Sequence, residues 1–384
     1  MDTIQLLLRL IRAEICGDSP TDIDLDSSAL TQLWKISKKH DIGHIIASAL
    51  LKNELIEAND IKQELKKSCM LSIYRCESMK HAYSEICSAL ENAEIPYIPL
   101  KGAVLRPLYP EEWMRTSCDI DILVREEDVD RAAEALINTL GYKADENPHY
   151  HDVSLFSPEG VHLELHFSIK EAMENIDSLL SKVWEYASAS ENSLYRYELT
   201  PEFFLFHHIA HMSYHFTHGG CGIKPFMDLY IIEKNITFDD NVVRQYCKQC
   251  GIESFYNYVL QLTNVWFGNE KHSEITQKMQ DYIISGGVYG SQKNQIALNQ
   301  SKKGSNLKFI LYRIFMPYNL LKTAYPVLEK HKWLYGFMLI HRWFKIFFGG
   351  RLKRAARELS ISTSIDSKSI TDMERLLREL GLHN

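Results

Sequence analysis

The chain has 384 residues, a formal net charge of −7, 45% hydrophobic residues and 24% charged residues. This length allows two or three domains with a sizeable core, and the composition is that of an ordinary globular protein. A protein that grips a long nucleic acid usually has a basic balance, so the acidic charge favours a small-molecule or protein substrate. No run of about 18 uncharged apolar residues predicts a membrane span, and the eight scattered cysteines favour a cytoplasmic location.

The first region, residues 1–92, predicts helices. Apolar side chains recur at helical spacing near the N-terminus, at Leu6, Leu7, Leu10 and Ile11. We expect this segment to be an amphipathic helix rather than a secretory signal. A polar loop is expected at 18–28, and a longer helix at 61–93.

The pattern changes in residues 93–198, which we expect to form an α/β core. Alternation of apolar and polar residues indicates strands, and glycine or proline indicates turns. In chain order we expect a strand at 95–101, a short helix at 103–109, a loop at 110–117, a strand at 119–124, a helix at 126–140, and a hairpin of strands at 153–156 and 161–167.

Two carboxylates in the strand at 119–124 are the most informative feature of the chain. Because successive strand side chains alternate between faces, Asp119 and Asp121 point the same way. We expect Glu164 to lie on the polar face of a neighbouring strand, at 161–167. Carboxylates this close repel each other, and oxygen ligands favour Mg²⁺ or Mn²⁺ as the compensating ion. A pair of such ions is commonly used by enzymes that catalyse phosphoryl or nucleotidyl transfer. The alternative to a metal site is that Asp119 and Asp121 only cap the turn that follows them.

The last region, residues 199–384, again predicts helices. We expect breaks near Gly219–Gly220, Gly286–Gly287 and Gly349–Gly350, and a polar linker at 301–305. The fold class is therefore α+β, with a small mixed-sheet core between helical N-terminal and C-terminal regions. A basic, aromatic stretch at 342–357 is expected to be a helix with a buried aromatic face, and the alternative is peripheral contact with a membrane surface or an acidic partner.

A resemblance to a known family rests on the stretch IPYIPLKGAVLRPLYPEEWMRTSCDIDILV, on the GY after the following helix, and on HLELHFSI. These residues, about 91–170, resemble the DNA polymerase β-like nucleotidyltransferase superfamily. More narrowly, the chain looks like the bacterial family of uncharacterised nucleotidyltransferases. The resemblance implies a Mg²⁺-dependent or Mn²⁺-dependent enzyme that takes a nucleoside triphosphate, ATP included, and an unknown small-molecule or protein acceptor.

The resemblance also implies roles for individual residues. Asp119 and Asp121 match the metal-binding aspartates, and Glu164 matches the third carboxylate and is the candidate general base. Backbone amides near Gly102 would face the nucleotide phosphates, with Lys101 and Arg115 as candidate phosphate contacts. The chain departs from the superfamily in having Gly102-Ala103 where Gly-Ser is common, and in a longer loop before Asp119. The alternative for Glu164 is an ion pair with Lys170 or Arg115. The alternative for Lys101 and Arg115 is that both are solvated surface cations.

A histidine stripe lies in residues 207–218, and its members His207, His208, His211, His215 and His218 follow helical spacing. One interpretation has this helix lining the nucleotidyltransferase cleft, with His211 and Asp228 in contact with the substrate. A second interpretation is the zinc site of a hydrolase, although the sequence has no carboxylate at the spacing that would complete such a site. Ordinary buried or surface histidines are the third. A rival for the whole chain is a nucleotide-binding scaffold of the same fold with weak catalysis.

Overall fold

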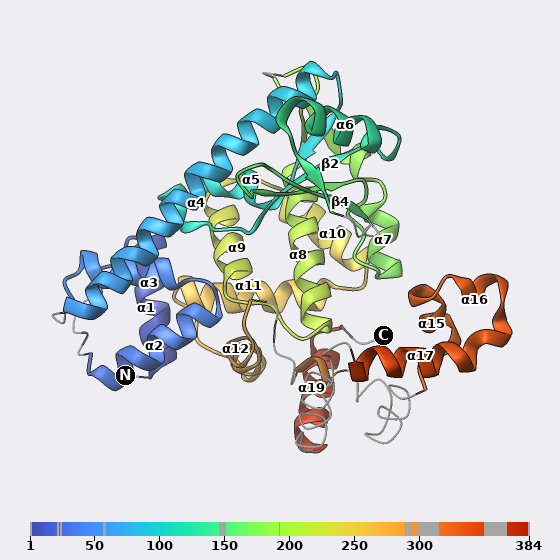
Figure 1. Cartoon of the computed structure of the whole chain (residues 1–384). Helices are drawn as coiled ribbons and strands as arrows, with labels where there is room; N and C mark the ends of the chain where they lie inside the picture. The colour runs from blue at the N-terminus through green and yellow to red at the C-terminus, as the bar shows by residue number, and fades with distance from the viewer. Residues whose placement is uncertain are drawn as a thin grey trace.

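The computed structural model describes residues 2–20, 23, 25–56, 59–145, 151–191, 193–288, 290, 294–296, 298, 315–348 and 367–382. Helices make up most of the molecule and surround one mixed sheet (Figure 1). The expected α+β architecture is confirmed. The division of the chain at residues 92 and 198 stays a prediction.

The N-terminal helices are α1 (Thr3–Ile15), α2 (Ser27–Lys39), α3 (Gly43–Lys52) and α4 (Asn59–Asn92). The sequence predicted helices in this region, including the N-terminal one and the long one, but did not specify α3. One stripe of α1 and of α2 is apolar, whereas α3 is buried along most of its length. In α1 that stripe is buried and includes Leu6, Leu7, Leu10 and Ile11. α4 is much longer and reaches from this helical group to the sheet (Figure 1).

The sheet has five strands in the order β1-β2-β5-β4-β3. Their bounds are Tyr97–Pro99 for β1, Asp119–Val124 for β2, Lys143–Ala144 for β3, Asp152–Phe156 for β4 and His162–His166 for β5. β2 pairs with β5 in parallel, and the other pairs are antiparallel. The predicted hairpin is therefore the β4–β5 pair. β2 lies inside the sheet, where it is paired on both sides.

Short helices connect these strands: α5 (Lys101–Leu105), η1 (Arg106–Leu108), η2 (Glu112–Met114), η3 (Glu126–Asp128) and α6 (Val129–Leu140). The sequence prediction was wrong about the first boundary. The strand ends at Pro99, and Gly102 lies in the first turn of a helix that already begins at Lys101. Gly141 ends α6 with a φ of 71°, as expected of a glycine C-cap.

One hydrophobic cluster holds the sheet in place. It joins the apolar face of β2 and β5 to the C-terminal half of α4 and to α6, through residues such as Ile86, Ile120, Ile122, Leu163 and Leu165. Because Ile120 and Ile122 are buried on this face, Asp119 and Asp121 are directed to the opposite face. A second, larger cluster unites the N-terminal and C-terminal helices.

The segment after β5 contains elements that the sequence did not predict: α7 (Glu174–Leu180), η4 (Val183–Tyr186), β6 (Ala187–Ala189) and β7 (Tyr197–Leu199). β6 and β7 form a separate two-stranded sheet. Their few residues carry too short a pattern to distinguish a strand from a loop. They lead the chain from the main sheet to the C-terminal helices.

The helices that follow are α8 (Pro201–Thr217), α9 (Lys224–Asn235), α10 (Asp240–Gln249), α11 (Glu253–Phe267), α12 (Glu274–Ser285), α15 (Tyr318–Ala324), α16 (Val327–Lys330), η5 (Lys332–Leu334), α17 (Tyr335–Phe348) and α19 (Ser367–Glu379). The breaks near Gly219 and Gly286 are confirmed. The linker at 301–305, the break at Gly349–Gly350 and residues 349–357 of the basic stretch lie outside the described residues. Within the described part of the chain, no helix combines the length and apolar character needed to cross a bilayer.

His44 ties the N-terminal helices to the segment that precedes β2. Its imidazole is buried, and Nε2–H donates to the carbonyl of Met114 at 2.9 Å. Burial lowers the pKa of His44 from 6.5 to about 4, and the Met114 carbonyl only partly offsets this effect. The folded protein therefore holds a neutral imidazole over a pH range in which the unfolded chain binds a proton.

This neutral imidazole predicts acid destabilisation. Since the unfolded state binds more protons between pH 6.5 and 4, the free energy of unfolding falls as the pH is lowered through that range. At pH 5 the loss from His44 alone is about 2 kcal/mol. We expect His44→Gln, which retains a donor but does not titrate, to lose about 2 kcal/mol less than wild type between pH 7.5 and 5 in urea unfolding. His81→Gln is the control, because His81 is 78% exposed, and its unfolding should follow wild type.

Candidate functional site

The parallel pairing of β2 with β5 brings the three predicted carboxylates together. Asp121 lies opposite Glu164 in the register, and Asp119 lies opposite His162. All three carboxylates are on the polar face of the sheet, since the alternate residues of both strands are in the core. The prediction that Glu164 lies on a neighbouring strand beside the aspartates is confirmed.

Asp121 is the most buried of the three, with a side chain that is 5% exposed. Its Oδ1 accepts hydrogen bonds from His166 Nε2 at 2.9 Å and from Lys101 Nζ at 3.1 Å. Burial would raise the pKa of Asp121, but these two cationic partners lower it far below the usual value. Asp121 is thus a carboxylate that stays ionised although it is buried.

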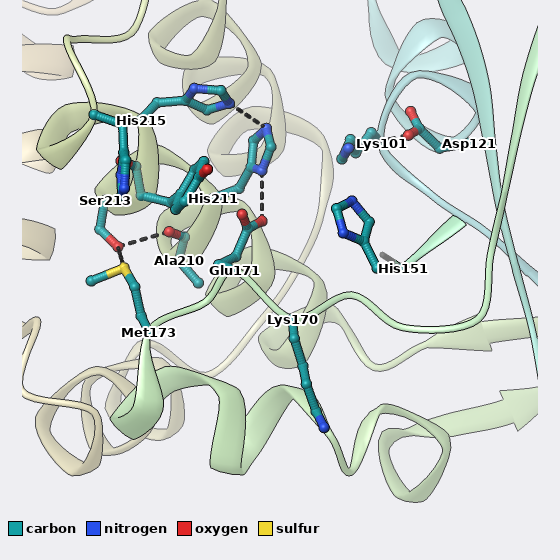
Figure 2. A network of polar contacts seen from close by, with 12 residues as sticks. Lys101, Asp121, His151, Lys170, Glu171, Met173, Ala210, His211, Ser213 and His215 are labelled. Carbon is teal, nitrogen blue, oxygen red and sulfur yellow. Dashed lines mark hydrogen bonds and ion pairs between the residues drawn. The ribbon is translucent and has the colours of Figure 1, made fainter. Parts of the chain in front are cut away.

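His166 takes the opposite shift for the same reason. Burial alone would lower its pKa, but hydrogen bonds to Asp121 and to Glu164, whose Oε2 lies 3.4 Å from Nε2, raise it to about 9. The alternative explanation of Glu164 as an ion pair with Lys170 or Arg115 was therefore wrong, because the partner is His166. Lys170 points away from the cluster (Figure 2).

Asp119 is the carboxylate of the three whose pKa is raised, since Lys101 and His162 offset only part of the opposing effects. Burial raises its pKa, and the charges of Asp121 and Glu164 raise it further. Glu164 differs, since its contact with His166 lowers its pKa. A divalent cation at this position would relieve the repulsion that Asp119 experiences.

The donor set fits such a cation. Ligand atoms of Asp119, His162 and Glu164 all lie within 4.8 Å of one another, and so do those of Asp121, Glu164 and His166. Glu164 belongs to both groups, so it is placed to bridge two positions. The oxygens suit Mg²⁺ or Mn²⁺, and the imidazoles make the set somewhat softer than three carboxylates alone.

Lys101 and Gly102 lie at the edge of this cluster. Lys101 has a φ of +39°, a region that non-glycine residues rarely adopt, and its ammonium faces Asp121. Burial would lower the pKa of Lys101, but Asp121 raises it, so the side chain is a permanent cation beside the carboxylates. A Cβ on Gly102 would lie only 3.3 Å from Ser117 Oγ, so close packing gives a second reason for glycine here. That Lys101 and Gly102 contact the nucleotide phosphates stays a prediction.

Arg115 and Asp228 lie together. Arg115 Nε donates to Asp228 Oδ1 at 2.6 Å, and the Tyr109 hydroxyl donates to the same oxygen at 2.7 Å. The side chains of Arg115 and Asp228 are 13% and 3% exposed. The two residues form a buried ion pair that fixes the segment before β2 against α9. Whether either also reaches the substrate stays a prediction.

His211 meets a carboxylate that sequence spacing did not reveal. Its Nδ1 lies 2.7 Å from Glu171 Oε1, and its Nε2 lies 3.0 Å from His215 Nε2 (Figure 2). Burial raises the pKa of Glu171, but the bond to His211 and the charges of His211, His207 and Lys101 together lower it to about 2. The Glu171–His211–His215 chain lies across from Lys101, whose charge also lowers the pKa of Glu171.

The remaining histidines of the stripe are not members of this hydrogen-bonded chain, although the charge of His207 helps to lower the pKa of Glu171. His208 contacts the carbonyl of Pro225 at 2.9 Å, and His207 is buried. None of the potential metal-binding groups among the described residues includes a histidine of α8, so the zinc interpretation gains no support. That His211 contacts the substrate stays a prediction.

Sequence reasoning missed His166 and Glu171 as residues of the candidate site. His166 had a signal, because it lies two residues after Glu164 and so shares its face of the strand. Glu171 had none, since it lies in a loop and meets α8 only through the tertiary fold.

The comparison with known families agrees with this geometry. The family model described as "Uncharacterised nucleotidyltransferase" matches residues 26–268, which is well over half of the chain and contains all three carboxylates. No curated protein and no solved structure gives a significant match. The chain therefore belongs to the uncharacterised nucleotidyltransferase family.

Proposed function

We propose that the protein is a Mg²⁺-dependent or Mn²⁺-dependent nucleotidyltransferase that moves a nucleoside monophosphate from a nucleoside triphosphate, such as ATP, to a hydroxyl of a small molecule or a protein. The observation that carries the proposal is the convergence of Asp119, Asp121 and Glu164 on one face of the β2–β5 pair. The net charge of −7 supports an acceptor other than a long nucleic acid.

In the proposed reaction the acceptor oxygen attacks the α-phosphorus, and the bond from that phosphorus to the bridging oxygen breaks. Pyrophosphate leaves with the electron pair, and Glu164 takes the proton of the acceptor hydroxyl. Held by Asp119, Asp121 and Glu164, the divalent cation would neutralise phosphate charge and activate the hydroxyl. Glu164 is ionised at neutral pH, as a general base must be, although the contact with His166 that lowers its pKa also makes it a weaker base.

Lys101 and His166 have distinct roles in this proposal. Lys101 brings a permanent positive charge to the edge of the cluster, where it can move from Asp121 to a phosphate oxygen. His166 holds Asp121 in one orientation through its 2.9 Å bond. It is a positioning residue, since it acts on Asp121 and not on the nucleotide.

The test uses purified protein with Mg²⁺ and α-labelled triphosphates in a lysate of acceptor candidates. Wild type should transfer label to an acceptor and release pyrophosphate. The double variant Asp119→Ala plus Asp121→Ala should do neither, and transfer that survives in it would exclude the proposal.

Two observations favour a second function. Asp121 already has two cationic partners, and Ala103 replaces the serine common in the superfamily, so the fold could serve as a nucleotide-binding scaffold. In that case the protein binds nucleoside triphosphate tightly, but it releases no pyrophosphate with any acceptor. Catalytic release of pyrophosphate excludes this version.

A further inference from the structure

The imidazole of His166 has two nitrogens, and the site described above uses one of them. Nε2 contacts Asp121 and Glu164. Nδ1 is buried without a hydrogen-bond partner among the described residues, on a side chain that is only 6% exposed. Buried polar atoms are rarely left unsatisfied, so this nitrogen points to a missing ligand.

The neighbours of this nitrogen are metal ligands by type. Asp152 lies opposite His166 in the antiparallel β4–β5 pair, and its side chain is 5% exposed. The ring of His151 is parallel to that of His166, with centroids 5.9 Å apart. Ligand atoms of the three residues lie within 4.8 Å of one another. Because Nε2 is engaged elsewhere, Nδ1 is the atom of His166 left for this group.

Direct contacts among His151, Asp152 and His166 do not satisfy the hydrogen-bonding capacity of their side chains. His151 Nε2 lies 3.5 Å from Asp152 Oδ1, which is long for a hydrogen bond, and neither group reaches Nδ1 of His166 with a bond. Asp152 Oδ2 accepts from the Ser154 hydroxyl at 3.3 Å, which orients the carboxylate and leaves Oδ1 for another partner. One divalent cation between the three side chains would satisfy all of them, and it would displace the proton from Nδ1 of His166 while Nε2–H stays bonded to Asp121.

From this arrangement we infer that His151, Asp152 and His166 form a second metal site, which takes a borderline divalent cation of the zinc class rather than Mg²⁺. Two imidazoles and one carboxylate are the donors that zinc and related transition metals prefer. Metal-bound histidines usually donate their other N–H to a carboxylate, and the bond from His166 Nε2 to Asp121 is of that kind. His151, with a side chain 45% exposed, gives the ion a route from solvent.

The inference does not rest on the proposed nucleotidyl transfer, although it gives that site a neighbour. His166 would bind the zinc-class ion through one nitrogen and orient Asp121 through the other. The oxygen-rich group around Asp119 keeps its preference for Mg²⁺ or Mn²⁺. The two positions differ in chemistry, so they can be filled and assayed separately.

The test measures zinc binding by the full chain. Metal-stripped protein is titrated with Zn²⁺ against a chromophoric chelator, with millimolar Mg²⁺ present to occupy the oxygen-rich group. Wild type should bind one equivalent, and His151→Ala and Asp152→Asn should each weaken binding by at least about tenfold. His162→Ala removes an imidazole from the Asp119 group and a 3.2 Å contact with the Ser154 hydroxyl, but no donor of the proposed site, so it should still bind one equivalent of zinc.

Two results would overturn the inference. The first is that wild type binds no zinc at micromolar concentration, or that the His151→Ala variant binds zinc as tightly as wild type does. The second is binding lost in His162→Ala and retained in His151→Ala, which would place zinc at the Asp119 group. Because Asp152 is buried, circular dichroism and thermal unfolding check that its variant folds. If the Asp152 variant does not fold, the half-buried His151 supplies a second variant. Label transfer with Mg²⁺ is measured separately, so failure of one proposal is distinguishable from failure of the other.

Discussion

Asp121→Asn is expected to reduce the rate of nucleotidyl transfer by about three orders of magnitude while the chain remains folded. The amide keeps the shape of the side chain and an oxygen that can accept from His166 and Lys101. The amide lacks the negative charge that holds a divalent cation, so the variant loses several kcal/mol of transition-state stabilisation. Initial rates of pyrophosphate release at saturating Mg²⁺ measure the effect.

Asp128→Asn is the matched control for this substitution. Asp128 is a largely buried aspartate close to the other end of β2, where it pairs with Arg131 at 2.6 Å, away from the carboxylate cluster. It should transfer label at nearly the wild-type rate. Equal losses in both variants would show that buried charge in this domain affects folding rather than catalysis, and would count against the proposed site.

Asp228→Ala is expected to lower the free energy of unfolding by about 3–5 kcal/mol. The substitution leaves the guanidinium of Arg115 buried without its counter-charge and removes the acceptor of the Tyr109 hydroxyl. Domains of ordinary stability unfold at a cost of about 5–15 kcal/mol, so the loss is a large share of the total. Urea unfolding followed by circular dichroism gives the difference.

The chain offers a close control in Asp240. This aspartate also accepts from an arginine, Arg244 at 2.5 Å, and from a tyrosine hydroxyl, Tyr256 at 2.7 Å, but its side chain is 45% exposed. Asp240→Ala should cost about 1 kcal/mol or less, because water screens the pair. Adding Arg115→Met to Asp228→Ala should restore part of the lost stability. If Asp228→Ala weakened nucleotide binding at unchanged stability, Asp228 would be a substrate contact instead.

The carboxylate trio could be predicted from the sequence because it depends on local rules. Alternation along a strand fixes which residues share a face, and this was enough to orient Asp119, Asp121 and Glu164. Adjacency of the two strands came from the resemblance, since a parallel pair leaves no turn signal in the sequence. The structure confirms both parts.

The partners of these residues could not be predicted in the same way. Glu171 reaches His211 from a loop, and Asp228 reaches Arg115 across a long separation in the chain. Such contacts are set by how helices pack on the sheet, and one sequence contains no periodic signal for that packing. The acceptor side of the reaction is hidden for the same reason, because acceptor recognition depends on the helices around the cluster.

The parallel pairing of β2 with β5 has a consequence for the order of folding. The hairpin of β4 and β5 closes a short loop, whereas the pairing of β2 with β5 requires closure of a longer crossover that includes α6, β3 and β4. Contacts between distant segments are slow to form because loop closure costs entropy before the contacts repay it. We therefore expect Asp121 and Glu164 to meet late in folding. A nascent or partly unfolded chain would then lack the metal-binding cluster, so divalent cations would stabilise the finished fold rather than an early intermediate.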